Sequence, residues 1–142
     1  MSIEPFHLSV PVKDLASARA FYGDLLGCKE GRSAEKRIDF NFFGHHLVTH
    51  VEPNDASHRT TTIDSAGVPT PCRHFGVVIS ADEWNKMADR LKAAKADFFT
   101  EPQVVFPGDV KEQSIMLVND GAGNIVEFKS VPPGMLFATK KK

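Results

Sequence analysis

Apolar and polar side chains alternate over residues 5–12, which is the pattern of a β-strand with one buried face. A helix is predicted directly after this strand, because Asp14 can cap its N-terminus and Gly27 suits its exit. Between these two residues, apolar side chains recur at helical spacing: Leu15, Ala18, Tyr22 and Leu25. Further strands are predicted at residues 28–33, 37–43 and 46–51.

The composition changes over residues 52–71, which hold three prolines, three consecutive threonines and few large apolar side chains. This composition is typical of a linker. The earlier order then returns, with a strand over 72–79 and a helix that starts where Ser80 and Glu83 have the spacing of a capping box. The apolar stripe of this helix has four members: Trp84, Met87, Ala88 and Leu91. Strands are predicted to follow at 98–105, 113–119 and 124–129.

The two series of elements indicate an internal repeat of one βαβββ module. His7-Leu8-Ser9-Val10 aligns with His74-Phe75-Gly76-Val77 at an offset of 67 residues, and Gly44 aligns with Gly121 at an offset of 77. The additional residues of the second half fit a loop around Phe106-Pro107-Gly108-Asp109. We therefore predict an α+β fold of two modules in tandem. Its parts are a first module at 5–51, a linker at 52–71, a second module at 72–130 and a C-terminal tail at 131–142.

Length and charge narrow the class of protein. A chain of 142 residues is expected to form a single domain, 1–142, with an adequate apolar core. The 17 basic and 18 acidic residues are nearly balanced and the basic ones are scattered, so no nucleic-acid partner is expected. Membrane-span, signal and paired-cysteine patterns are absent from the sequence, and we expect a cytoplasmic protein that binds no membrane.

Four side chains of metal-ligand type occupy equivalent positions in the two predicted modules. An offset of 67 residues pairs His7 with His74, and an offset of 77 pairs His50 with Glu127. Imidazole nitrogens with a carboxylate oxygen suit Fe(II), Mn(II), Ni(II), Co(II) or Zn(II), and two histidines with one carboxylate form the facial triad of non-haem iron oxygenases. The prediction of a metal site rests on this joint placement, because a single histidine on a strand is more often a buried core residue.

The assignment of His50 depends on the register of its strand. A slip of one residue would place Thr49 in the pocket and His50 outside it. In a helix, His46 and His50 could share a metal ion, but in a strand they stand about 13 Å apart, so at most one of them joins the site. His58, in the linker, is expected to be exposed to solvent.

The alternation over residues 37–43 also predicts a pocket wall. If Ile38, Phe40 and Phe42 pack under the helix, the opposite face presents these candidate substrate-binding residues: Arg37, Asp39 and Asn41. The equivalent positions of the second module are Ser114, Met116 and Val118, of which Met116 is the further candidate for substrate contact. Such a cavity suits a small organic substrate with a polar or anionic end. Alternatively, Arg37 and Asp39 form a solvated ion pair.

The sequence resembles the vicinal oxygen chelate superfamily, which comprises glyoxalase I, bleomycin and fosfomycin resistance proteins and extradiol dioxygenases. The resemblance covers about residues 5–130 and is carried by three stretches: Phe6-His7-Leu8-Ser9-Val10-Pro11-Val12, His74-Phe75-Gly76-Val77, and Asp120-Gly121-Ala122-Gly123-Asn124-Ile125-Val126-Glu127. Gly121 stands where proline is usual, which should only alter the turn. The resemblance implies sheets that curl around a metal and substrate cavity, with His7, His74 and Glu127 as metal ligands and His50 at the position of a fourth. It also implies a homodimer, and the linker length lets the modules pair within one chain or between two.

These residues lead to a functional expectation. A divalent-metal enzyme is expected, with Fe(II) favoured and a dioxygenase-like reaction on a small substrate with vicinal oxygens. With His50 as a fourth ligand the site would instead resemble glyoxalase I, a lyase, in which Glu127 is the catalytic residue that moves a proton. A third possibility is a metal-free protein that sequesters an antibiotic or toxin, although such proteins typically lack the ligand set.

Overall fold

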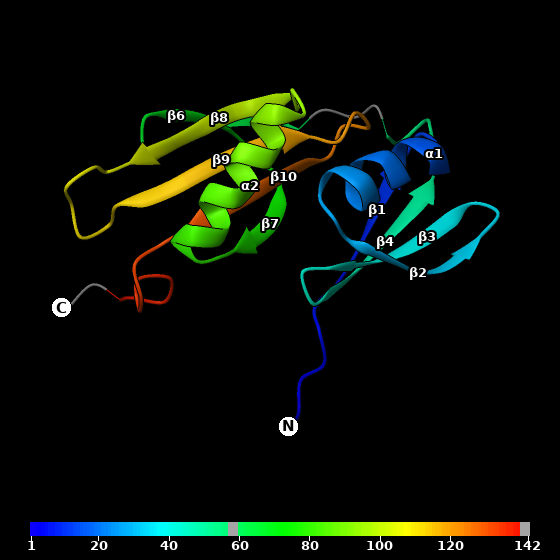
Figure 1. Ribbon diagram of the computed structural model, residues 1–142, viewed down its shortest axis with the longest axis horizontal. Helices are drawn as coiled ribbons and strands as arrows, with labels where there is room; N and C mark the ends of the chain where they lie inside the picture. The colour runs from blue at the N-terminus through cyan, green and yellow to red at the C-terminus, as the bar shows by residue number, and fades with distance from the viewer. Residues whose placement is uncertain (57–59, 140–142) are drawn as a thin grey trace. The chain divides into compact units, whose positions relative to one another are not determined.

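The computed structural model describes residues 1–56 and 60–139, which group into two compact units (Figure 1). Unit 1 comprises Met1–Arg59 together with Asn119–Asn124. Unit 2 comprises Thr60–Val118 together with Ile125–Lys142. Each unit contains one helical segment and one four-stranded sheet.

Unit 1 contains β1 (His7–Val12), α1 (Leu15–Ala18), the π-helix η1 (Arg19–Leu25), β2 (Lys29–Ala34), β3 (Arg37–Phe42) and β4 (His45–Val51). Its sheet has the order β1-β4-β3-β2, with β1 and β4 parallel and the other pairs antiparallel. Asp14 caps the helical segment as predicted, because its side chain accepts a hydrogen bond from the Ser17 amide at 2.7 Å. The segment begins as an α-helix and continues as a π-helix, whereas the sequence predicts an α-helix throughout.

Unit 2 repeats this arrangement with β7 (Phe75–Val78), α2 (Ala81–Ala93), β8 (Phe98–Val105), β9 (Gln113–Asn119) and β10 (Ile125–Ser130). The sheet order is β7-β10-β9-β8, again with the first and last strands of the module parallel. Ser80 caps α2 and accepts a hydrogen bond from the Glu83 amide at 3.2 Å. The α+β fold of two tandem βαβββ modules is therefore confirmed.

A hairpin lies within the segment that the sequence predicts as a linker. It consists of β5 (Thr62–Ser65) and β6 (Val68–Pro71), which pair antiparallel. The turn between them has positive φ at both Ala66 and Gly67, which is the geometry of a tight two-residue hairpin. His58, expected in solvent, falls outside the described residues.

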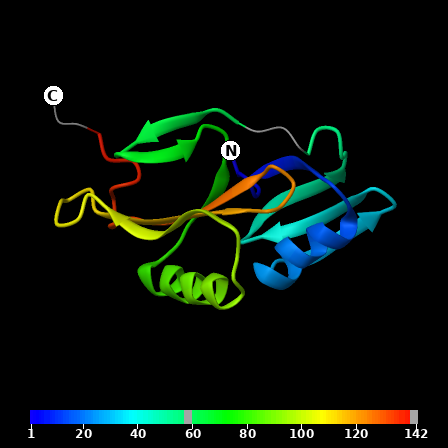
Figure 2. The same ribbon diagram turned by 90° about the horizontal axis from the view of Figure 1, so that it is seen from above.

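Each sheet has its helical segment on one face (Figure 2). The apolar side chains of the strands pack against the helix on that face. In unit 1 the predicted alternation is confirmed, because Ile38, Phe40 and Phe42 are all buried. In unit 2 the indole N–H of Trp84 donates to the Phe128 carbonyl of β10 at 3.0 Å, which ties α2 to its sheet. In unit 2 a separate buried apolar cluster of Val105, Ile115, Leu117 and Ile125 packs with Val68 of β6.

A buried tyrosine joins η1 to the β9–β10 turn within unit 1. The hydroxyl of Tyr22 donates to Asp120 Oδ2 at 2.8 Å, and burial together with the Asp120 charge raises the pKa of Tyr22 well above its ordinary value. We expect Tyr22→Phe to lower the free energy of unfolding by about 1.5 kcal/mol, the lower end for bonds to charged groups. The loss is no larger because Asp120 Oδ2 still accepts from Asn124 Nδ2. Urea unfolding followed by circular dichroism measures this, and a change below about 0.5 kcal/mol would contradict it.

Candidate functional site

In unit 2, a histidine and a glutamate meet at the start of β7. His74 immediately precedes β7, and Glu127 lies on the adjacent strand β10, where it is the register partner of Gly76. His74 Nε2 lies 2.8 Å from Glu127 Oε2. His74 Nδ1 lies 2.7 Å from the Pro71 carbonyl oxygen, and because a carbonyl can only accept, Nδ1 is the donor. This bond fixes the imidazole with Nε2 turned towards the carboxylate.

The pair has the geometry of two adjacent metal ligands. Two ligand atoms that each lie about 2.1 Å from a common ion, at about 90° to each other, are themselves about 3 Å apart. The observed separation of Nε2 and Oε2 is 2.8 Å. A ligating histidine also usually donates its other nitrogen to a carbonyl or carboxylate, as His74 does to Pro71. His74 and Glu127 are therefore two side chains of the types that ligate divalent cations, at a separation that also suits an ion pair.

Lys129 and Gly76 position the glutamate. Lys129 Nζ lies 3.5 Å from Glu127 Oε1, the oxygen that faces away from His74. Gly76 lies so close to β10 that a Cβ at this position would overlap the backbone of Glu127. Glu127 itself is almost fully buried. A cavity of about 240 Å³ opens at this pair and is lined by His74, Phe75, Gly76, Val77, Val78, Glu127, Lys129 and Leu136.

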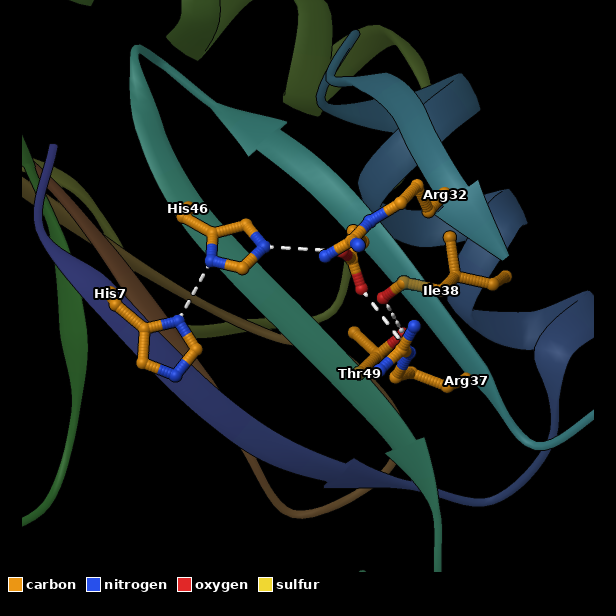
Figure 3. Close-up of polar contacts among 7 residues, drawn as sticks. His7, Arg32, Arg37, Ile38, His46 and Thr49 are labelled. Carbon is orange, nitrogen blue, oxygen red and sulfur yellow. Dashed lines mark hydrogen bonds and ion pairs between the residues drawn. The ribbon is translucent and has the colours of Figure 1, made fainter. Parts of the chain in front are cut away.

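In unit 1, a second polar cluster lies on the face of the sheet opposite the helix. His7 of β1 and His46 of β4 are register partners, and their Nδ1 atoms lie 2.8 Å apart (Figure 3). The two rings are stacked, with centroids 4.8 Å apart and an interplanar angle of 30°. His46 Nε2 lies 3.2 Å from Asp39 Oδ2 on β3. Three polar side chains from three strands therefore form a continuous chain of contacts.

Asp39 is buried among positively charged neighbours. Arg32 Nη2 lies 3.4 Å from Asp39 Oδ2, and Arg37 Nε lies 3.5 Å from Oδ1. Burial by itself would raise the pKa of Asp39, but the hydrogen bond with His46 and the charges of Arg37, His46 and Arg32 outweigh it and hold the pKa below its ordinary value. The carboxylate is thus the acceptor in its contact with His46. A cavity of about 390 Å³ adjoins this cluster and is lined by Pro5, Gly31, Arg32, Asp39, Phe40, Asn41, Gly44, His45 and His46.

The structure places the predicted ligands in two groups. His74 and Glu127 come together in unit 2, whereas His7 belongs to unit 1. Among residues 1–56 and 60–139, no three or more histidine, cysteine, aspartate or glutamate side chains form a cluster that could hold a metal ion. The ligand set of three therefore stays a prediction.

The neighbour of His7 is a residue that the sequence analysis did not select. His50 is the register partner of Pro11, four residues along β1 from His7, and His46 takes the place beside His7. Thr49 is fully buried and donates to the Ile38 carbonyl, so the slipped register is not adopted. The first and last strands of the module, β1 and β4, pair in parallel, and this pairing places His46 opposite His7. Knowledge of the pairing would therefore have identified His46 as the neighbour of His7.

The predicted pocket residues differ in their placement. Asp39 and Asn41 line the unit 1 cavity, and Arg37 makes its ion pair with Asp39. The Arg37 side chain of this pair is 39% exposed and that of Asp39 is 8% exposed, so solvent reaches the pair mainly at Arg37. Met116 is fully buried in β9 and lines neither of the two cavities described above. Substrate contact by any of these residues stays a prediction.

Comparison with known proteins identifies the family. The profile of the Glyoxalase/Bleomycin resistance protein/Dioxygenase superfamily matches residues 5–128. The chain belongs to this superfamily. Among curated protein sequences, none matches it significantly. In the part of the chain that the structure describes, no helix has the length and apolarity to cross a membrane.

Solved structures of superfamily members share the fold over almost the whole chain. A glyoxalase/bleomycin resistance protein/dioxygenase from Alicyclobacillus acidocaldarius is 28% identical, with a TM-score of 0.78 and 95% of this chain and 96% of that chain covered. The fosfomycin resistance protein FosX from Listeria monocytogenes, complexed with Mn(II) and sulfate, is 16% identical, with a TM-score of 0.68 and coverage of 94% and 93%. Lactoylglutathione lyase from Agrobacterium tumefaciens is 19% identical, with a TM-score of 0.61 and coverage of 99% and 100%.

Proposed function

We propose that this protein is a mononuclear divalent-metal enzyme that acts on a small organic substrate with two adjacent oxygen atoms. The proposed ligands are His7, His74 and Glu127. The observation that carries the proposal is the separation of 2.8 Å between His74 Nε2 and Glu127 Oε2, with His74 Nδ1 held by the Pro71 carbonyl. His7 is assigned as the third ligand from the sequence repeat, which sets it in register with His74. We further propose that the protein is a homodimer.

The burial of Glu127 favours an enzyme over a metal-free sequestering protein. An ionised carboxylate loses hydration free energy when it is buried, and this loss is recovered only by charged partners or a coordinated cation. The contact between Lys129 Nζ and Glu127 Oε1 is long, at 3.5 Å. The other carboxylate oxygen, Oε2, contacts His74 Nε2.

The chain's own residues define what the site can do. A divalent cation would polarise the two substrate oxygens and stabilise the negative charge that develops on them. Pro71 and Lys129 hold His74 and Glu127 in orientation, and the Glu127 carboxylate lines the unit 2 cavity, where it can accept a proton from a bound substrate. We favour Fe(II) and a dioxygenase-like reaction, because two histidines with one carboxylate leave coordination positions open. Mn(II), found with FosX, is the second choice.

Metal analysis with two activity assays tests this proposal. Protein purified without chelators is expected to carry one equivalent of a divalent metal and to consume oxygen when supplied with catechols. Conversion of a hemithioacetal without oxygen consumption would replace the dioxygenase assignment by the glyoxalase-like one. If the protein does not bind one equivalent of any divalent metal, the enzyme proposal is overturned in favour of sequestration.

A further inference from the structure

A chain of hydrogen bonds runs across three strands of unit 1 and ends at a proposed metal ligand. It connects Asp39 Oδ2 on β3 to His46 Nε2 on β4 at 3.2 Å, and His46 Nδ1 to His7 Nδ1 on β1 at 2.8 Å (Figure 3). The strand register sets the order of this chain, because His7 and His46 are direct partners. The function proposed above assigns no role to His46 or to its contacts with Asp39 and His7.

We propose that Asp39 and His46 are positioning residues that hold His7 in the tautomer with a proton on Nδ1 and a free lone pair on Nε2. This inference rests on the proposed function for its purpose, since the lone pair on Nε2 is the group that would coordinate the metal. The tautomer itself is a property of the metal-free protein. It can therefore be tested without the metal.

The direction of the hydrogen bonds follows from the acceptor at one end. The carboxylate of Asp39 can only accept, so the proton in its contact with His46 lies on Nε2 of the histidine. When His46 is in its neutral form, its imidazole carries one N–H and one lone pair, so Nδ1 accepts. The partner atom, Nδ1 of His7, must donate across the 2.8 Å contact. The remaining nitrogen of His7, Nε2, is left without a proton.

Two arginines keep the carboxylate in its role. Arg32 Nη2 shares Oδ2 with His46, at 3.4 Å, while Arg37 Nε faces Oδ1 at 3.5 Å. The Asp39 side chain is 8% exposed, whereas those of Arg32 and Arg37 are 80% and 39% exposed, so water screens the two arginine charges in part. They favour the ionised, acceptor-only form on which the direction of the chain depends. The two imidazole rings lie with their centroids 4.8 Å apart and their planes inclined at 30°.

The tautomer of His7 can be read directly by long-range ¹H–¹⁵N NMR spectra of the metal-free protein at pH 8, where a free imidazole is neutral. The wild-type protein is expected to show a protonated Nδ1 and an unprotonated Nε2 at His7. His46→Phe keeps an aromatic ring beside His7 but removes both nitrogen atoms, and it should abolish the preference for a protonated Nδ1. Asp39→Asn is the second variant. Its amide can either accept from or donate to His46, so a mixture of the two His7 tautomers is expected.

The matched control is His45→Phe. His45 precedes His46 on β4 and lines the same cavity, but its ring contact is with Phe6. In a titration with Mn²⁺ followed by EPR of the free ion, His46→Phe should bind about 10–100-fold more weakly than wild type, the usual cost of losing an outer-shell partner. His45→Phe should retain both the wild-type affinity and the wild-type tautomer at His7.

The outcomes separate this inference from the proposed function. A protonated Nε2 at His7 in the wild-type protein, or an unchanged tautomer in both His46→Phe and Asp39→Asn, would overturn the positioning role. Circular dichroism shows whether each variant is folded, and Asp39→Asn decides the question if His46→Phe is not. If the expected tautomer is found but wild-type protein binds no Mn²⁺ or Fe²⁺, the positioning of His7 stands and the metal-enzyme proposal fails.

Discussion

Replacing Glu127 by glutamine is expected to abolish stoichiometric metal binding while leaving the protein folded. The amide keeps the size of the side chain but lacks the anionic oxygens, of which Oε2 lies 2.8 Å from His74 Nε2. Because a coordinating group is lost, the affinity for Mn²⁺ or Fe²⁺ should fall by more than the about 10–100-fold typical of outer-shell variants. Elemental analysis of the purified protein and competition with a chelator measure the loss.

Glu101→Gln provides the control for this substitution. Glu101 is an exposed residue of β8, so the same chemical change there should leave metal content and affinity unaltered. Circular dichroism should be unchanged in both variants. Metal content in Glu127→Gln equal to that of the wild type and of Glu101→Gln would exclude Glu127 as a ligand.

The substitution Gly76→Ala is expected to destabilise unit 2 strongly and to weaken metal binding. Gly76 is the register partner of Glu127 in the parallel pair of β7 and β10, and an added Cβ would overlap the backbone of Glu127. The obstacle is backbone rather than a flexible side chain, so the two strands must move apart. Overpacking costs about 1–3 kcal/mol in ordinary cores, and here we expect at least the upper value.

Thermal unfolding measures the cost, which should appear as a fall in Tm of roughly 10 °C. Gly23→Ala makes the same chemical change in η1, where the nearest atom to the added Cβ is 3.9 Å away, at Phe40. This control should unfold within a few degrees of the wild type. Equal unfolding temperatures for Gly76→Ala and Gly23→Ala would show that β7 and β10 do not approach as closely as described.

The elements that the sequence predicts correctly are those specified by local signals. The caps at Asp14 and Ser80 depend on contacts only three residues away, and both are formed. The alternation of Ile38, Phe40 and Phe42 is a property of one strand, and all three side chains are buried as expected. The repeat of the βαβββ order then follows from the succession of such elements. Fold class could therefore be read from the chain.

The features that the sequence analysis missed depend on pairing between distant strands. His46 lies beside His7 only because β1 and β4 are parallel partners, although the two residues are 39 positions apart in the chain. An alignment of one module on the other does not fix this register, and it selected His50. The burial of Asp39 has the same origin, because its neighbours come from β2 and β4 as well as β3. Local periodicity cannot report such contacts.

The hairpin of β5 and β6 was missed for a different reason. Its prolines, Pro69 and Pro71, lack the amide proton of a strand residue and are typical of linkers. In a two-stranded hairpin every strand is an edge, and proline is tolerated there. The turn has positive φ at both Ala66 and Gly67, and alanine at its first position is not typical of a two-residue hairpin turn.

The most direct test of the proposed metal centre is anomalous diffraction from crystals of the wild-type protein grown with Mn²⁺. The proposal predicts one strong manganese peak within about 2.2 Å of His74 Nε2, a carboxylate oxygen of Glu127 and Nε2 of a His7, either from the same chain or from a second copy. A manganese peak away from His74 and Glu127, or none in protein that has bound stoichiometric Mn²⁺, would contradict it.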